Sequence, residues 1–354
     1  MRRAAGTLAI ALAAAAVLLL LPSPIAPVAW VPSAKPPLAG PWAPDASLGS
    51  ASLLARGRIR GPEDVAVDAE GRVYAGTADG RIVRVSADGQ QVETFAATGG
   101  RPLGLRFAPD GRLIVCNAPL GLQAVDPQGR VVTLATEAGG IPIRLADGID
   151  IAADGTIYFS DASTTFGVED SLFDVLEGRP HGRLLRYDPA TRRTTVLRDG
   201  LYFANGVALS QHEDFVLVSE TSRYRITRVW LAGTRAGTYD VFAENLPAIP
   251  DGIAANGKGT FWVAFFTLRN DELDRRLHPH PRAKALLAKL PRAVWPKPVP
   301  YGLVAAFDEE GRVLRSLHDA GGKHVRQITT AREHGAVLYF GTLDDDWIGK
   351  YPLP

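Results

Sequence analysis

The feature that most constrains the fold is a rhythm of short apolar runs and tight turns that begins near residue 51. Runs of β-branched and aromatic residues alternate with turns built on Asp-Gly, Glu-Gly or Asn-Gly pairs, such as Asp79-Gly80 and Asp154-Gly155. Glycine tolerates a positive φ and aspartate caps the turn, so such pairs between apolar runs indicate β-hairpins. Little helical periodicity interrupts the pattern before residue 268. We therefore expect an all-β chain.

A longer repeat is superimposed on the hairpins. Units of four short strands follow one another near residues 61–98, 102–136, 147–197, 205–243, 251–317 and 324–353. A propeller blade of four strands takes roughly 40–50 residues, so the repeat predicts a six-bladed β-propeller. The last unit is short of an outer strand, which Ala51–Ile59 could supply, closing the ring. A pair of β-sandwiches is the structural alternative.

The N-terminal residues predict a membrane-targeting segment. Arg2 and Arg3 precede an apolar run that ends at Leu21, and a helix needs about 20 such residues to span a bilayer. Residues 1–21 are either a signal anchor or a signal peptide, and the anchor is favoured because no clear cleavage motif follows. We expect a membrane-anchored protein with an extracytoplasmic (periplasmic or extracellular) propeller, or a protein secreted after signal cleavage.

The sequence predicts that the chain is divided into three segments, the last of which carries two insertions. The bounds are the signal anchor or signal peptide at 1–21, a Pro-rich linker at 22–50, the propeller at 51–354, and insertions at 164–181 and 268–300.

The second insertion is long and basic. Leu286, Leu287 and Leu290 suggest a short amphipathic helix within it. Eight basic and three acidic residues between Arg269 and Lys297 leave a net charge of +5. It is a solvated flap, a lid over the channel, or a surface that contacts anionic lipid.

The overall charge and the cysteine content exclude some classes of function. The net charge is +1, which gives no indication of a nucleic-acid partner. Cys116 is the single cysteine, so no intrachain disulfide can form, and we expect it to be a small buried apolar residue.

Four of the repeat units begin their innermost strand with an oxygen-bearing side chain, namely Glu63, Asp147, Asn205 and Asp251. Innermost strands line the channel of a propeller, so these side chains should converge on its axis. Three carboxylates in a partly desolvated channel repel one another at a cost of several kcal/mol unless a cation lies among them. Because neither His nor Cys accompanies these oxygens, the pattern favours Ca²⁺, with Mg²⁺ or Mn²⁺ also possible.

The four ligand candidates have an alternative explanation, and further residues are candidates for the channel. Each Asp-Gly or Asn-Gly pair taken alone would be an ordinary turn, so the metal hypothesis rests on their common register. Asn117, Arg101 and Arg326 are candidates to line the substrate channel, and His324 is a candidate base, although a lone histidine is more often structural. No Gly-x-Ser-x-Gly, His-Glu-x-x-His or phosphate-binding glycine-rich motif occurs, which disfavours serine-hydrolase, zinc-protease and nucleotide chemistry.

Several longer stretches resemble the strictosidine synthase-like family. They include Gly61-Pro62-Glu63-Asp64-Val65-Ala66-Val67-Asp68, Phe203-Ala204-Asn205-Gly206-Val207-Ala208-Leu209 and Asn245-Leu246-Pro247-Ala248-Ile249-Pro250-Asp251. The resemblance covers about residues 35–353 and implies a six-bladed propeller. It also implies a relation to paraoxonases and to gluconolactonase-type senescence marker proteins, which bind catalytic calcium in the channel and hydrolyse lactones or aryl esters.

The resemblance also suggests calcium ligands in this chain, and it shows where the chain differs from the related enzymes. Glu63, Asn205 and Asp251 match calcium ligands of those related enzymes, whereas Asp147 stands where they have asparagine, which adds a negative charge. Paraoxonases have Asp-Asn where this chain has Asp251-Gly252, so one ligand is missing. Strictosidine synthase uses a glutamate at the position that Arg326 occupies in this chain, and a guanidinium cannot accept the proton that condensation releases.

Three functions are therefore considered. The first is a calcium-dependent hydrolase of small-molecule lactones or aryl esters, with the metal polarising the carbonyl and with Glu63 and His324 as candidate catalytic groups. The second is a non-catalytic, membrane-anchored propeller with structural calcium and a partner-binding face. The third is a carbon–nitrogen lyase or condensation activity of the strictosidine synthase type, which Arg326 disfavours.

Overall fold

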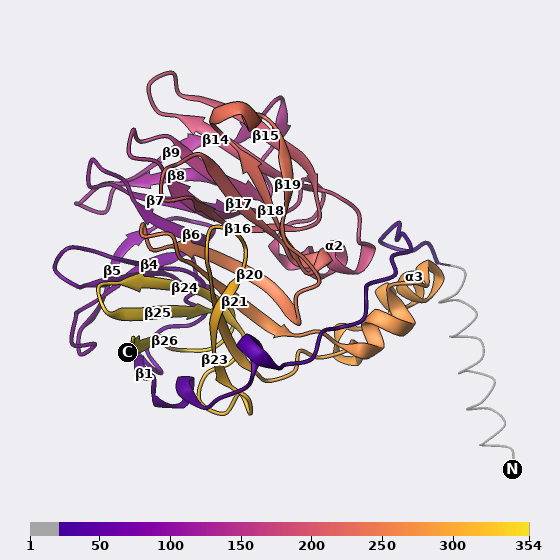
Figure 1. Ribbon diagram of the computed structural model, residues 1–354. Coiled ribbons are helices and arrows are strands. Elements are labelled where there is room, and N and C mark those ends of the chain that lie inside the picture. The colour runs from indigo at the N-terminus through magenta and orange to yellow at the C-terminus, as the bar shows by residue number, and fades with distance from the viewer. Residues whose placement is uncertain (1–20, 354) are drawn as a thin grey trace, which may run out of the picture.

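The computed structural model describes residues 21–353 and shows six four-stranded antiparallel sheets arranged around a channel (Figure 1). In five of the sheets the strands follow one another outward from the channel in chain order. The six-bladed β-propeller predicted from the repeat is confirmed.

Blades 1 to 3 form the first half of the ring, and the strands of each blade are named from the innermost outward. Blade 1 comprises β2 (Val65–Val67), β3 (Val73–Gly76), β4 (Arg81–Val85) and β5 (Val92–Ala97). Blade 2 comprises β6 (Arg101–Phe107), β7 (Leu113–Ala118), β8 (Gly121–Val125) and β9 (Val131–Ala135). Blade 3 comprises β12 (Ala146–Ile151), β13 (Ile157–Asp161), β14 (Gly182–Asp188) and β15 (Arg193–Leu201).

The second half of the ring repeats this arrangement. Blade 4 comprises β16 (Ala204–Leu209), β17 (Phe215–Glu220), β18 (Arg225–Trp230) and β19 (Tyr239–Ala243). Blade 5 comprises β20 (Ala248–Ala255), β21 (Phe261–Leu268), β22 (Gly302–Phe307) and β23 (Val313–Asp319). Blade 6 comprises β24 (Ile328–His334), β25 (Val337–Thr342), β26 (Ile348–Pro352) and β1 (Ser52–Leu54). A small hairpin of β10 (Glu137–Ala138) and β11 (Ile141–Pro142) joins blades 2 and 3.

The ring is closed by a strand from the N-terminal side of the propeller. Strand β1 pairs antiparallel with β26, placing Leu54 opposite Ile348. This pairing supplies the outer strand that the sixth repeat unit lacks, as the sequence predicted. Blade 6 is therefore built from both ends of the described chain.

The hydrophobic core is divided among the spaces between blades. In the space between blades 2 and 3, for example, Ile114 and Cys116 of β7 pack with Ile149, Phe159 and Leu185 of blade 3. Cys116 has no exposed surface, which confirms the apolar role expected for this thiol. Each blade is thus held to its neighbour by apolar side chains on both of its faces.

Two insertions interrupt the blades, and we call residues 162–181 and 269–301 the cap. The first contains η3 (Val168–Asp170) and α2 (Ser171–Glu177), and the second contains the π-helical turn η6 (Leu273–Leu277), α3 (Pro281–Ala288) and η7 (Arg292–Val294). Each insertion joins the second strand of its blade to the third, at the end of the blade where the innermost strand starts. The helices α2 and α3 lie against each other at the right in Figure 1.

Residues 22–50 have little secondary structure and lie against the propeller. They contain η1 (Gly40–Trp42) and η2 (Ser47–Ser50), and the ring of Trp42 packs against Phe265 and Phe307 of blade 5. Blade 4 carries two further short turns, η4 (Thr221–Arg223) and η5 (Gly233–Arg235). Residues 1–20, which hold nearly all of the predicted signal segment, lie outside the described residues. Within residues 21–353, no helix has both the length and the apolar character needed to cross a membrane.

The innermost strands approach one another closely around the channel. The pairings of β12, β16 and β20 with their neighbours each shift register at the Asp-Gly or Asn-Gly pair of the strand. These pairs are therefore β-bulges and not hairpin turns. A Cβ atom on Gly148 would lie 2.6 Å from the carbonyl oxygen of Asn205, and one on Gly206 would lie 2.1 Å from the amide nitrogen of Ile253. Only glycine leaves room for the backbone of the next blade.

We predict that Gly206→Ala destabilises the propeller by roughly 2–4 kcal/mol, because the added methyl group must displace backbone and not a flexible side chain. Denaturant unfolding followed by tryptophan fluorescence measures the change. Gly167→Ala is the matched control, since its Cβ would meet nothing within 4 Å, and it should leave the unfolding midpoint nearly unchanged. Equal effects of the two substitutions would contradict the close packing at the axis.

Candidate metal centre

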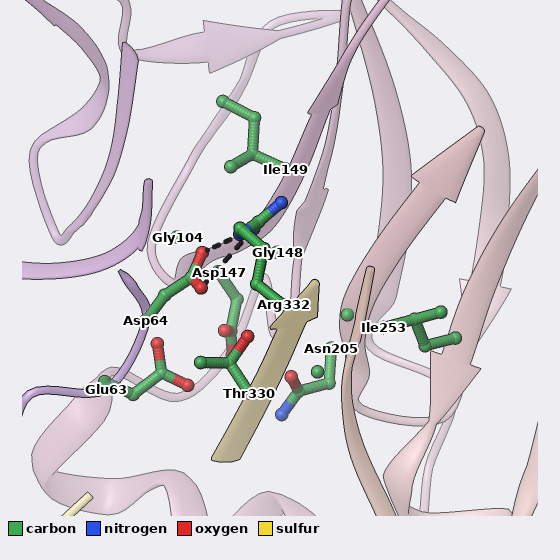
Figure 2. Close-up of a pocket in the computed structure, with 12 residues that line it drawn as sticks. Glu63, Asp64, Gly104, Asp147, Gly148, Ile149, Asn205, Ile253, Thr330 and Arg332 are labelled. Carbon is green, nitrogen blue, oxygen red and sulfur yellow. Dashed lines mark hydrogen bonds and ion pairs between the residues drawn. The ribbon is translucent and has the colours of Figure 1, made fainter. Parts of the chain in front are cut away.

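The structure brings together the four predicted ligand residues at the start of four innermost strands. Glu63 lies two residues before β2, while Asp147, Asn205 and Asp251 lie within β12, β16 and β20. The exposed fraction of each residue is between 5% and 7%. Figure 2 shows Glu63, Asp147 and Asn205 reaching from different blades into one space beside Thr330.

The three carboxyl groups of this set strongly disfavour joint ionisation. Burial raises the pKa of Glu63 well above its usual value, and the charges of Asp147 and Asp64 raise it further. Burial and then the charge of Asp251 raise the pKa of Asp147 in the same way. The pKa of Asp251 is raised by burial and by Glu63, and is lowered in part by the Asn205 amide. The three groups therefore interact as one set with an excess of negative charge.

The donor chemistry of the set fits a hard divalent cation. Three carboxylates and one amide supply only oxygen donors, which suit Ca²⁺ or Mg²⁺ better than zinc or copper. Within residues 21–353, no three His, Cys, Asp or Glu side chains are arranged so that they alone could hold a metal ion. The amide oxygen of Asn205, which lines the same pocket as Glu63 and Asp147, is a further candidate donor.

Hydroxyl groups from neighbouring blades fix the backbone of the ligand residues. The Ser160 hydroxyl, on the second strand of blade 3, donates to the carbonyl oxygen of Asn205 at 2.6 Å. Ser219 makes the equivalent bond from blade 4 to the carbonyl of Asp251. Thr329 of blade 6 donates to the carbonyl of Glu63 at 2.6 Å. These bonds tie the starts of the innermost strands together around the ring.

A second set of charged side chains lies beside the first, and the sequence pattern did not predict it. Asp64 accepts from the backbone N–H of Leu105 at 2.9 Å and pairs with Arg332 at 3.1 Å. Asp150 accepts from the N–H of Leu209 at 2.9 Å and pairs with Arg106 at 3.0 Å. Each aspartate links one blade to the next, and each has an arginine as its counter-charge. Figure 2 shows the pair of Asp64 and Arg332 next to the candidate ligands.

Two of the predicted channel residues carry polar atoms without protein partners. Among the described residues, both Nη atoms of Arg101 and the Oδ1 of Asn117 are buried and find no hydrogen-bond partner. The charge of Arg101 lowers the pKa values of Glu63 and Asp147. The Nδ2 of Asn117 donates to Gln123 at 2.8 Å. Arg101 therefore compensates part of the negative charge of the ligand set.

The two predicted residues of blade 6 make contacts outside the pocket. The Nε2 of His324 donates to the carbonyl oxygen of Ala51 at 2.6 Å, which holds the ring near the closing strand. Arg326 donates to Asp345 at 2.8 Å and its side chain is 44% exposed. Neither residue is among those that line the pocket shared by Glu63, Asp147 and Asn205. The position of His324 gives no support to a role as the base.

These features define a class: a six-bladed β-propeller with buried oxygen-bearing side chains from four blades at one end of its channel. A strictosidine synthase model matches residues 147–234, and a strictosidine synthase-like N-terminal model matches residues 40–85. The adipocyte plasma membrane-associated protein of Rattus norvegicus is 38% identical over 360 residues, with 95% of each chain covered. The protein STRICTOSIDINE SYNTHASE-LIKE 3 of Arabidopsis thaliana is 34% identical over 330 residues, with 84% of this chain and 83% of the relative covered. The chain belongs to the strictosidine synthase-like family.

Solved structures of other propellers share the fold at low sequence identity. A gluconolactonase from Xanthomonas campestris superposes with a TM-score of 0.63 at 18% identity, covering 94% of this chain and 99% of that one. Regucalcin from Agrobacterium tumefaciens, described as a calcium-binding protein, superposes with a TM-score of 0.59 at 14% identity, covering 85% and 91%. The propeller architecture is thus shared with these proteins.

We predict that Asp147→Asn stabilises the calcium-free protein at alkaline pH. The carboxyl group of Asp147 has a raised pKa when folded, while in the unfolded chain it ionises near pH 4. Its contribution to the free energy of unfolding is therefore lost as the pH rises through the folded pKa. In EGTA at pH 8 the variant should melt a few degrees above the parent protein, and the difference should vanish near pH 4.

Thermal unfolding between pH 4 and pH 8, with and without Ca²⁺, measures this effect. Calcium should raise the melting temperature of the parent protein more than that of the variant, because one charged ligand has been removed. Asp199→Asn is the control, since this carboxylate is exposed on β15, and it should change neither quantity. If Ca²⁺ does not change the melting temperature of the parent protein at any pH, this result would argue against the metal centre.

Proposed function

We propose that this protein is a calcium-dependent hydrolase of lactones or aryl esters. The observation that carries the proposal is a pocket shared by the buried side chains of Glu63, Asp147 and Asn205, with the buried Asp251 beside it, where it interacts with Glu63 and Asn205. The raised pKa values of the three carboxyl groups mean that they need a cation to be ionised together. The shared fold with a gluconolactonase and with a calcium-binding regucalcin is consistent with this proposal.

The proposed mechanism assigns roles to residues of this chain. Glu63, Asp147, Asn205 and Asp251 would hold the ion. When bound, a calcium ion supplies Lewis-acid polarisation of an ester carbonyl and stabilises negative charge on its oxygen. The carboxylate of Glu63 is the candidate to accept the proton of the attacking water, because it is buried in the same pocket as Asp147 and Asn205.

Burial of the ligand set also assists the proposed reaction. The innermost strands and the second set of charges leave little room for bulk water around Glu63 and Asp147. Electrostatic interactions are stronger in such surroundings than in water. Arg101 lies beside the same two carboxylates and would keep the loaded centre near neutrality, since one guanidinium and one divalent ion balance three carboxylates.

Carbon–nitrogen condensation remains disfavoured. The reaction would need a proton acceptor at the position of Arg326, but this guanidinium is permanently charged and is paired with Asp345. The family name therefore does not carry over to the activity that we propose.

We predict that the purified protein hydrolyses phenyl acetate or a γ-lactone, that EGTA abolishes the reaction and that added Ca²⁺ restores it. Glu63→Gln should lower kcat by at least about 100-fold, because it removes both a charged ligand and the candidate base. Asp68→Asn, in the first hairpin of the same blade, is the control and should keep full activity. If Ca²⁺ raises the melting temperature but a broad panel of esters and lactones shows no turnover, the ion is structural and the propeller is a non-catalytic binding protein.

A further inference from the structure

We propose that the outer surface of the cap docks on an anionic phospholipid bilayer. The end of the channel that holds the candidate metal-binding residues would then face the membrane. This proposal rests on the predicted membrane segment and on the contacts of the cap, and it does not depend on the hydrolase activity.

The cap covers the end of the propeller where the ligand residues start. Val168 and Val175 of the first insertion pack against the cluster that contains Leu145, two residues before Asp147. In the second insertion, the backbone N–H of Val299 donates to the hydroxyl of Thr267, near the end of β21, at 2.9 Å. Both insertions are therefore anchored beside the channel and not at the opposite end of the blades.

The chain reaches the cap immediately after the predicted membrane segment. Ile25 is 6% exposed and packs between Leu176 and Ala288, so it contacts both halves of the cap. The predicted apolar segment ends at Leu21, and four residues can span at most about 14 Å. A membrane segment that ends at Leu21 would thus hold the cap within this distance of the bilayer.

Specific hydrogen bonds fix this junction. The backbone N–H of Ala26 donates to the carboxylate of Glu177 at 2.8 Å, and the Nε of Arg179 donates to the carbonyl of Ala26 at 2.6 Å. Farther along, the N–H of Trp30 donates to the carbonyl of His278 at 2.9 Å. The segment is therefore seated on the cap and is not a free spacer, and in Figure 1 it runs past α2 and α3 before crossing the propeller.

The exposed surface of the cap combines apolar and basic side chains with the acidic Glu169 and Asp170 of the first insertion. Leu172 on α2 is 47% exposed, Leu286 on α3 is 39% exposed and Val294 on η7 is 60% exposed. Arg282 and Lys297 are exposed on the second insertion. Apolar side chains that enter the headgroup region and cations that face phosphate are the two features of an interfacial membrane surface.

The acidic side chains of the second insertion are already paired within it. Asp274 pairs with Arg269, Asp271 with Arg275, and Glu272 with Arg276. The remaining basic residues of the insertion therefore outnumber its unpaired acidic ones.

Three of these remaining cations lie on the exposed surface. Arg282, Arg292 and Lys297 are exposed, and Arg292 also reaches Asp170 of the first insertion at 3.3 Å. Lys284, in contrast, is buried and donates to the carbonyl of Glu177 at the C-terminus of α2. Each exposed charge contributes an attraction of about 1 kcal/mol to an anionic surface.

The test measures the orientation of the full-length chain in lipid vesicles. Single cysteines are introduced by Ala293→Cys on the cap, or by Lys258→Cys on the hairpin between β20 and β21 at the opposite end, and are labelled with a fluorophore. The native Cys116 is fully buried and should not react. Quenching by nitroxides attached to lipid headgroups then reports which end lies at the membrane.

We expect strong quenching of the label at position 293 and little at position 258 in vesicles of phosphatidylcholine with phosphatidylglycerol. The triple substitution Arg282→Gln, Arg292→Gln, Lys297→Gln should reduce the docked population at least about tenfold, as should vesicles of phosphatidylcholine alone. The matched triple Arg192→Gln, Arg193→Gln, Lys258→Gln removes the same charge from hairpins at the opposite end and should leave the quenching at position 293 unchanged.

Equal quenching at both positions, or stronger quenching at position 258, would overturn the proposal. The proposal would also be overturned if the fluorescence of the label at position 293 changed with protein concentration and not with lipid charge. That result would identify the cap as a contact between copies or with a protein partner. Because quenching requires no substrate, absence of ester hydrolysis would count against the proposed activity without affecting this result.

Discussion

The close contact of the innermost strands around one axis is the constraint on which the rest of this structure depends. Glycines such as Gly148 and Gly206 let the backbone of one blade touch that of the next, with no room for a side chain between them. The residue before each glycine must then point into a space shared with the equivalent residues of other blades. When those residues are acidic, their charges are buried together, and the nearby Arg101 compensates part of the charge of Asp147. Packing of the backbone thus determines the electrostatics of the channel.

Much of the fold could be predicted from the sequence because strands and hairpins have local signals. Turn residues and the spacing of apolar runs indicated the six blades, the insertions and the closing strand. At Asp147-Gly148, which the sequence places at the start of an inner strand, a pair that is typical of a turn forms a bulge. Local sequence does not distinguish the two, because the difference lies in whether another blade approaches the glycine.

The candidate site was predicted less completely, for physical reasons that differ between residues. Glu63 and its partners share a register, which is visible in the sequence. Asp64 directly precedes β2 and Asp150 lies within β12, so each is a charge next to apolar residues of an inner strand, but their arginine partners belong to other blades. His324 was predicted as a candidate base from the chemistry of its imidazole. Its position could not be predicted, because its bond to Ala51 depends on a segment more than 270 positions away in the chain.

Closure of the ring by strand β1 has a consequence for the order of folding. Strand β26 near residue 350 finds its outer neighbour only at residues 52–54, so the last blade can be completed only when almost the whole chain has been synthesised. Blades 1 to 5 draw their strands from consecutive sequence and can assemble as they emerge. Until the two ends meet, β26 and β1 expose unpaired backbone edges that could pair with other chains. The pairing of β1 with β26 would therefore be the last step of folding, and it would commit the molecule to a closed ring.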